Sequence, residues 1–165
     1  MSLKTRCLIL KRIFAICLTI MMLFALCACG GNEASSKTYD LNAIRDKMIA
    51  DLAIEDPLML ATERLSELYD IAQEDVQEAA CFITLGSVFS DEIVMIRATD
   101  EAAAGRIREK LSAHLADVTN QAQNYDAESL ALFQKCKVGQ DGNYVNLFIS
   151  PKYTEMQEIF TAAGK

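Results

Sequence analysis

The chain has 165 residues, and its 23 acidic side chains outnumber its 16 lysines and arginines, which gives a net charge of −7. Residues 1–28 hold four of these bases and no acid, so residues 29–165 carry −11. An acidic body of this kind is repelled by nucleic acid and by anionic lipid headgroups. The composition therefore argues against a nucleic-acid-binding protein and against electrostatic docking onto a membrane.

Residues 1–28 have the organisation of a bacterial secretion signal. Four lysines and arginines come first, an apolar run from Ile13 to Leu26 follows, and small residues close the segment. A basic start, an apolar centre and a small-residue cleavage site are what secretion requires. A permanent transmembrane helix is the alternative, but the 16 residues from Ile13 to Ala28 fall short of the roughly 20 that cross a bilayer core.

The end of this signal, Leu26-Cys27-Ala28-Cys29, resembles the lipobox of bacterial lipoproteins. Cys27, at the second position before the modified cysteine, departs mildly from the usual alanine, serine or threonine. The resemblance implies that Cys29 receives a diacylglyceryl group, carries fatty acids such as palmitate and becomes the new N-terminus. Since two acyl chains hold a protein stably where one does not, we expect a lipid anchor at the outer face of the cell membrane. A plain secreted form and an uncleaved anchor remain the alternatives.

The rest of the chain divides into a tether and one domain. Residues 29–38 comprise the lipidated cysteine and a small, polar tether, and residues 39–165 have the length of a single globular domain. Four of the six cysteines lie within the first 29 residues, so only Cys81 and Cys136 remain in the domain. An oxidising exterior permits a disulfide between them. We favour two separate buried thiols, because free cysteine packs as a small hydrophobe.

The first part of the domain predicts two helices followed by a hairpin. A helix is expected over residues 41–52 and a shorter one over residues 63–69. The period then changes, and residues 76–85 alternate as a strand that is apolar on much of both faces. After a turn at residues 90–92, the strongly apolar residues 93–96 predict a second strand, antiparallel to the first.

A long amphipathic helix is predicted over residues 100–124. Its apolar residues recur every three or four positions and therefore line one face. They are Ala103, Ile107, Leu111, Leu115, Val118 and Ala122. A coiled coil would need apolar groups where His114 and Gln121 stand, so we expect an ordinary helix that covers a sheet.

The last part of the domain predicts helical turns over residues 126–133, strands over 135–138 and 143–149, and a final helix after Pro151. The two glycines and the aspartate of residues 139–142 suit a tight hairpin between these strands. The order helix-helix-strand-strand-helix-strand-strand-helix favours an α+β fold. We expect a four-stranded antiparallel sheet with helices packed mainly on one face.

Four short motifs follow one another behind the lipobox. They are a helix ending in Leu68-Tyr69-Asp70-Ile71, the turn Asp91-Glu92-Ile93, a long helix ending near Tyr125-Asp126 and the hairpin Gly142-Asn143-Tyr144-Val145. Their order resembles an uncharacterised family of lipoproteins from Gram-positive Firmicutes, domain of unknown function 4358. The resemblance spans residues 39–160 and implies the location and the fold. The family brings no known activity or ligand.

Candidate catalytic residues are sparse. His114 is the only histidine, and Ser112, two residues away on the same helix, points to another side. We therefore interpret His114 as a partly exposed structural histidine. Acidic pairs at turns and helix starts are usually solvated or capping groups. These pairs are Glu74-Asp75, Asp91-Glu92 and Asp100-Glu101.

Metal and sugar sites have little support in the sequence. The stretch Asp141-Gly142-Asn143 lacks the twelve-residue ligand spacing of a calcium loop. The chain has no tryptophan to serve as a platform for a sugar. The tyrosines are expected at the edge of the core with wet hydroxyls. They are Tyr69, Tyr125, Tyr144 and Tyr153. We expect no cofactor and no metal site, and we assign no catalytic residue.

Two classes of function remain open. A non-catalytic surface module would bind an envelope protein or a small ligand, with Phe82 as a contact if it is exposed and as a core residue if a helix covers it. A small envelope-associated hydrolytic enzyme would need a cleft that gathers Glu92 or Asp141 with Tyr144 or His114. We favour the binding or accessory module.

Overall fold

The computed structural model describes residues 37–85, 91–123 and 126–165. The expected signal peptide, Cys29, Ser90 of the predicted turn and Tyr125 lie outside these residues. Among the residues described, none of the helices combines the length and the apolarity that a bilayer crossing demands. The elements are, in chain order, α2 (Leu41–Asp51), β1 (Leu58–Leu60), α3 (Arg64–Tyr69), the 3-10 turn η1 (Gln73–Asp75), β2 (Val76–Ala79), β3 (Cys81–Ile83), β4 (Glu92–Ala98), α4 (Glu101–Ala122), α5 (Ala127–Phe133), β5 (Val138–Asp141), β6 (Tyr144–Ile149) and α6 (Tyr153–Ala163).

One antiparallel sheet forms the centre of the domain, with the strand order β1-β3-β4-β6-β5. β2 and β3 follow each other along the same side of β4, β2 beside its second half and β3 beside its start. Between them, the Ala80 N–H donates to the carbonyl oxygen of Met95 at 2.9 Å. The single strand predicted over residues 76–85 is therefore divided in two.

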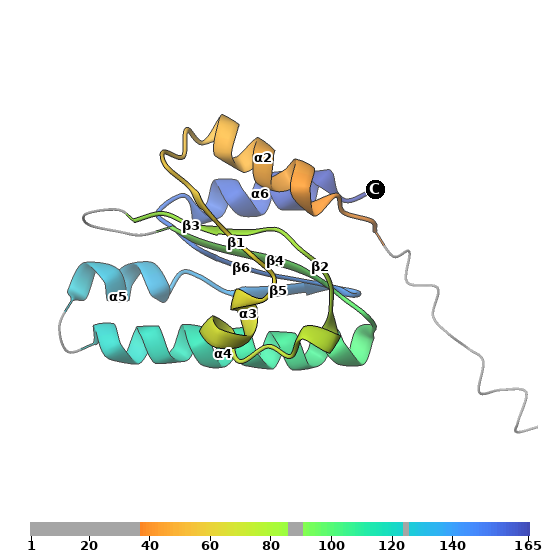
Figure 1. Cartoon of the computed structure of the whole chain (residues 1–165). Helices are drawn as coiled ribbons and strands as arrows, with labels where there is room; N and C mark the ends of the chain where they lie inside the picture. The colour runs from red at the N-terminus through yellow and green to blue at the C-terminus, as the bar shows by residue number, and fades with distance from the viewer. Residues whose placement is uncertain (1–36, 86–90, 124–125) are drawn as a thin grey trace, which may run out of the picture. The chain divides into compact units, whose positions relative to one another are not determined.

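The prediction of four strands with helices mainly on one face is wrong in both respects. The described sheet has six strands, because one predicted strand is divided and the three-residue β1 is added. Figure 1 shows α2 and α6 on one face and α3, α4 and α5 on the other. The reason lies in the central strands, since Ile93–Ile96 of β4 and all of β6 are buried. Strands that are apolar on both faces need a cover on both.

Each face of the sheet has its own apolar core. On one face, Ile107 and Leu111 of α4 pack against residues of β4 and β6. On the other, Met48 of α2 and Met156 of α6 pack in the same cluster as Phe82 of β3. Phe82 has no exposed surface, so it is a core residue and not the surface contact that an open sheet face would have made it.

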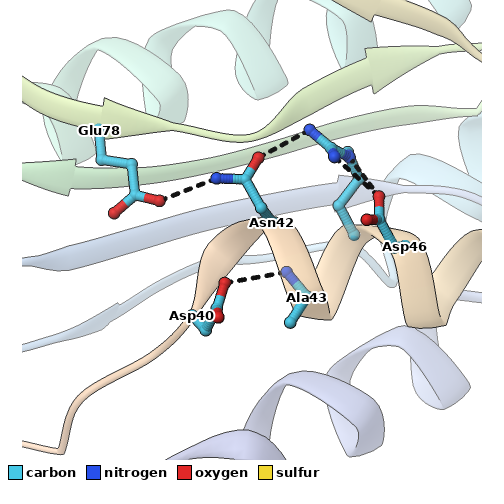
Figure 2. A network of polar contacts seen from close by, with 6 residues as sticks. Asp40, Asn42, Ala43, Asp46 and Glu78 are labelled. Carbon is cyan, nitrogen blue, oxygen red and sulfur yellow. Dashed lines mark hydrogen bonds and ion pairs between the residues drawn. The ribbon is translucent and has the colours of Figure 1, made fainter.

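Polar contacts at the start of α2 tie this helix to the sheet (Figure 2). The Asp40 carboxylate accepts the Ala43 N–H at 3.0 Å, which caps the helix. The Asn42 amide donates to Oε1 of Glu78, on β2, at 3.1 Å. Arg45 in turn donates to the Asn42 side-chain oxygen at 2.8 Å. The first turn of α2 is therefore held both by its own cap and by a strand of the sheet.

The β5–β6 hairpin is confirmed, but its first strand begins at Val138 where the sequence predicts residues 135–138. The turn is the dipeptide at 142–143, and Gly142 has a φ of +55°, which glycine adopts without strain. Gly139 lies inside the strand. A Cβ at this position would come within 2.4 Å of Oδ1 of Asn146 on β6. Gly139 therefore permits close strand packing and does not form the turn.

The two ends of the described domain meet. The Thr38 N–H donates to the Lys165 carbonyl oxygen at 3.0 Å, and the Lys165 N–H donates to Thr38 at 3.3 Å. Thr38, the last residue of the predicted tether, therefore belongs to the folded domain.

Candidate functional site

One candidate set of chemical groups comes together on the α4 face of the sheet. Nε2 of His114, on α4, lies 2.8 Å from Oε1 of Glu92, the first residue of β4. Tyr69, the last residue of α3, packs edge-on against the imidazole with ring centres 5.0 Å apart. The side chains of Glu92 and His114 are 21% and 23% exposed. Of the pairings considered for an enzyme, the structure brings together Glu92 with His114, and it also places Asp141 opposite Tyr144 in the β5–β6 hairpin.

The contact between these two side chains is an ion pair with an imperfectly aligned hydrogen bond. Nε2 and Oε1 are close, yet neither atom makes a well-directed hydrogen bond within the described part of the chain. Contact with the Glu92 carboxylate raises the pKa of His114, and burial opposes this effect. Burial and the nearby charge of Glu92 also raise the pKa of Tyr69. The arrangement favours a proton on His114 instead of leaving Nε2 free to accept one.

The nearby thiol is chemically inert. Cys81 of β3 is buried in the same core cluster as Tyr69, and its Sγ lies 3.7 Å from the Met95 carbonyl oxygen. Burial raises the pKa of Cys81 to about 12, whereas a nucleophilic cysteine needs an accessible thiolate. Cys81 and Cys136 are both buried and free, which confirms the interpretation of two separate thiols.

The hydroxyl of Ser112 is also directed away from His114. It donates to the backbone carbonyl oxygen of Arg108 at 2.7 Å. This agrees with the prediction that the two side chains point to different sides of the helix. His114 therefore has a carboxylate that orients it. The hydroxyl considered as its nucleophile, that of Ser112, does not contact it.

The acidic pairs have separate structural roles. Asp100 caps α4 by accepting the Ala103 N–H at 2.7 Å. Asp75 of η1 accepts two hydrogen bonds from Arg106 of α4, one of them from Nε at 2.9 Å. Asp75 is buried, so the expectation of a solvated or capping group is wrong for this residue, and the pairing with Arg106 lowers its pKa. Glu74 and Glu101 are exposed, as the prediction of solvated groups requires.

Asp91 connects the ends of three strands, so the expectation that it is a solvated turn residue is wrong. The Ser150 hydroxyl, beyond β6, donates to Oδ1 at 2.6 Å. The Thr84 hydroxyl, beyond β3, donates to Oδ2 at 3.2 Å and accepts the Asp91 N–H at 2.8 Å. Ser150 is fully buried and also accepts the Lys152 N–H at 3.0 Å. This polar clamp, made of Asp91, Thr84 and Ser150, holds one end of the sheet together.

The tyrosines that the sequence singled out do not form one surface. Tyr69 belongs to the core on the α4 face, whereas Tyr144 and Tyr153 belong to the core under α2 and α6. Tyr69 and Tyr144 are buried, and Tyr153 is partly exposed. They are therefore core and core-edge residues and not an aromatic platform.

Tyr39 is the aromatic residue that sequence reasoning missed. Its hydroxyl donates to Oδ2 of Asp141 at 2.6 Å, and its ring stacks on Phe160 with centres 4.5 Å apart. Burial and the bond to Asp141 raise the pKa of Tyr39 to about 12. An apolar or aromatic residue directly before a helix cap often packs against the first turns of that helix. The position of Tyr39 before the Asp40 cap was the signal for its burial.

Exposed apolar side chains gather at one edge of the sheet. Among the described residues, the large hydrophobic side chains with substantial exposure are Leu58 (52%), Met59 (47%), Leu68 (39%) and Leu85 (82%). Leu58 and Met59 form most of the edge strand β1, and Leu85 lies two residues beyond Ile83, the β3 partner of Leu58. Leu68 lies on α3, the next helix along the chain. We call Leu58, Met59 and Leu85 the β1 edge patch.

The β1 edge patch lies in an acidic part of the molecule. Residues 55–78 contain eight acidic side chains and one base, Arg64, which is itself paired with Glu67 at 3.0 Å. Glu55 and Asp56 precede β1, separated from it by Pro57, and are exposed. Together with Leu85, Asp91 and Lys152 they line a surface hollow of about 580 Å³, and the Lys152 ammonium group donates to the Leu52 carbonyl oxygen. The edge therefore combines an apolar centre with a negative rim.

We predict that His114 titrates above 6.5, its ordinary pKa, because the Glu92 carboxylate stabilises the imidazolium. As the only histidine of the chain, it gives a single set of imidazole signals in a ¹H–¹³C NMR titration. The substitution Glu92→Gln should lower this pKa, whereas Asp46→Asn, at an exposed site on α2, should leave it unchanged. A His114 pKa at or below 6.5 in the unmodified chain would contradict the ion pair.

The same ion pair predicts how stability depends on pH. Because the pKa of His114 is higher in the folded state than in the unfolded chain, its stabilising contribution is complete below the unfolded pKa and disappears as the pH rises through the folded pKa. Between about pH 6 and pH 8, the Tm of the unmodified chain should fall relative to that of His114→Gln.

Comparison with known proteins gives one result. Residues 50–150 match the family model described as "Domain of unknown function (DUF4358)". The match runs from the end of α2 to Ser150 and so includes Glu92, His114 and the β1 edge patch. No curated protein and no solved structure matches the chain. Since the matched residues make up more than half of the sequence, the chain belongs to the DUF4358 family.

Proposed function

We propose that this protein is a lipid-anchored, extracytoplasmic binding module that holds its partner at the β1 edge patch. One observation supports this most directly: of the large exposed apolar side chains among the described residues, Leu58 and Met59 lie on the edge strand β1, and Leu85 lies just beyond its neighbour β3. Single exposed apolar residues are normal on a surface, but Leu58 and Met59 stand on opposite faces of an edge strand that has no strand partner on its outer side among the described residues. Helices cover both faces of the sheet, so a partner can reach the sheet backbone only at its edges, of which β1 is one.

The anchor in this proposal is a diacylglyceryl group on Cys29. The support is the lipobox-like segment that ends at this cysteine, after a basic and then apolar leader. With a net charge of −11, residues 29–165 gain no attraction from an anionic bilayer. Acyl chains would supply the attachment that charge does not.

The alternative, a small envelope-associated hydrolase, draws on the pair Glu92–His114. The chemical state of the groups around that pair supports binding over hydrolysis. The Ser112 hydroxyl, considered as a nucleophile for His114, donates instead to the Arg108 carbonyl oxygen. The pKa of Cys81 is raised by burial to about 12, which keeps its thiol neutral.

The anchoring step predicts that Cys29→Ser abolishes incorporation of a labelled fatty acid. The variant should then be released into the medium or remain as an unprocessed precursor, since the acylated sulfur is gone. Cys27→Ser is the matched control, because serine is common at that position of a lipobox, and it should be labelled as fully as the unmodified chain. Continued lipid labelling of Cys29→Ser would refute the anchor.

The docking step is tested by a photo-crosslinking amino acid introduced at position 59 in intact cells. We expect a discrete crosslinked species from position 59 that disappears when Leu58→Ser is added, because the contact depends on apolar area at the edge. Position 158, exposed on α6, is the control and should give no such species. Equal adducts from both positions, or none from position 59, would contradict docking at this edge.

A further inference from the structure

We infer that the partner docks as an additional strand beside β1, and that this strand has an apolar centre flanked by lysines or arginines. This inference rests on the proposed function and specifies its partner chemically. The backbone of β1, the side chains of the edge patch and the charge of the rim each contribute one part of the argument.

The backbone of β1 is paired on one side only. β3 aligns with it through the pairs Leu58–Ile83, Met59–Phe82 and Leu60–Cys81. On its other side, the described residues provide no strand. In an antiparallel pair, alternate residues direct their N–H and C=O groups away from the partner strand. An extended peptide can use these groups by strand addition.

The side chains of β1 favour an apolar centre in the incoming strand. Directly paired residues share a face of the sheet, so Leu58 lies on the face of Ile83 and Met59 on the opposite face with Phe82. Leu58 is 52% exposed and Met59 47% exposed. Successive residues of an added strand would pack against Leu58 on one face and Met59 on the other, which removes apolar area from water.

The rim favours basic flanks. Of the acids in residues 55–78, Asp70 and Asp75 are already paired with Lys110 and Arg106 of α4. Glu55 and Asp56 stand exposed beside the start of β1. Lysines or arginines at the ends of an added strand would face these carboxylates, which favours basic partners and repels acidic ones.

The same charge disfavours two other occupants of the edge. A second copy of this chain would bring another −11 and another acidic rim to the contact. An anionic membrane surface would be repelled for the same reason. β1 has only three residues and follows a proline, so an added strand gains few backbone hydrogen bonds and the complex should be weak and transient.

The experiment uses the full-length chain in detergent and a dye-labelled peptide, Lys-Lys-Thr-Val-Ile-Val-Thr-Lys-Lys. Fluorescence anisotropy should show binding at least about tenfold tighter than for the same peptide with glutamates in place of lysines. The double substitution Leu58→Ser with Met59→Ser should weaken binding at least about tenfold. Equal affinity for the two peptides, or no response to the double substitution, would overturn the inference.

The charge and backbone parts have their own controls. The double variant Glu55→Gln with Asp56→Asn should weaken peptide binding and make it less dependent on salt. The control, Glu155→Gln with Glu158→Gln, makes the same charge change on exposed residues of α6. It should alter neither the affinity nor its salt dependence. N-methylation of the peptide backbone should abolish binding at alternate central positions only, because alternate N–H groups face β1. Equal effects of the two charge variants, or of methylation at every central position, would overturn strand addition.

Two further outcomes identify the other occupants. A dimer in sedimentation that dissociates with Leu58→Ser and Met59→Ser would assign the edge to a second copy. Binding of the Cys29→Ser chain to phosphatidylglycerol vesicles, lost with the same double substitution, would assign it to a membrane. Either result overturns the inference. A crosslinked partner at position 59 without any response to the peptide would overturn strand addition alone and leave the proposed function standing.

Discussion

Phe82→Ala is expected to lower the free energy of unfolding by about 3–5 kcal/mol. Phe82 lies on β3 with no exposed surface, inside the core that α2 and α6 complete. Truncation removes most of its buried area and leaves a cavity that the surrounding helices and strands can only partly fill. Chemical denaturation followed by circular dichroism would measure the change.

The matched control for this prediction is Leu85→Ala, two residues beyond the end of the same strand. Leu85 is 82% exposed, so its truncation should change the free energy of unfolding by no more than about 0.5 kcal/mol. Similar small effects of the two substitutions would mean that the α2 and α6 face of the sheet is open, and that Phe82 is a surface residue.

Asp91→Ala is expected to cost about 2–4 kcal/mol of stability. The substitution removes the carboxylate that accepts from the Ser150 and Thr84 hydroxyls. The Ser150 hydroxyl is fully buried, so it loses its acceptor in a place where water does not replace it. Thermal and chemical unfolding of the full chain would measure the loss.

A surface acid and a double variant make this prediction specific. Asp46→Ala removes an exposed carboxylate paired with Arg45 and should change stability by no more than about 1 kcal/mol. The double variant Asp91→Ala with Ser150→Ala removes the buried hydroxyl along with its acceptor. Its loss of stability should therefore be smaller than the sum of the losses of the two single variants. Full additivity would contradict a shared clamp.

Local signals allowed the helices to be predicted. Asp40 and Asp100 both accept an N–H three residues on, as helix caps do, and the apolar spacing of residues 103–122 matches the buried face of α4. These signals are local because a helix satisfies its hydrogen bonds within itself. The α5 and α6 helices also lie where helical turns over residues 126–133 and a final helix after Pro151 are predicted.

The sheet required information that is not local. β1 has only three residues, too few for a periodic pattern, and its position depends on pairing with β3 more than 20 residues later in the chain. Residues 93–96 were predicted only as a strongly apolar strand, and the cover of α2 and α6 over one of its faces follows from the tertiary structure. The first strand of the last hairpin was misplaced because Gly139 was interpreted as a turn residue.

The candidate site was partly visible in the sequence. Glu92 and His114 were both named, but their meeting depends on how α4 lies on the sheet, and Tyr69 joins them from a third element. The β1 edge patch was not visible, since Leu58-Met59-Leu60 looks like any short apolar run. Its exposure results from β1 lying at the end of the strand order.

The two buried thiols make the domain convenient for labelling. Cys81 and Cys136 are 2% and 4% exposed, and burial raises the pKa of both, so neither reacts readily with a maleimide. Within the described part of the chain, a cysteine introduced at position 59 or 158 would therefore be the one site open to a fluorophore or spin label. Distances from the edge strand to a bound partner can then be measured without first replacing the two native cysteines of the domain.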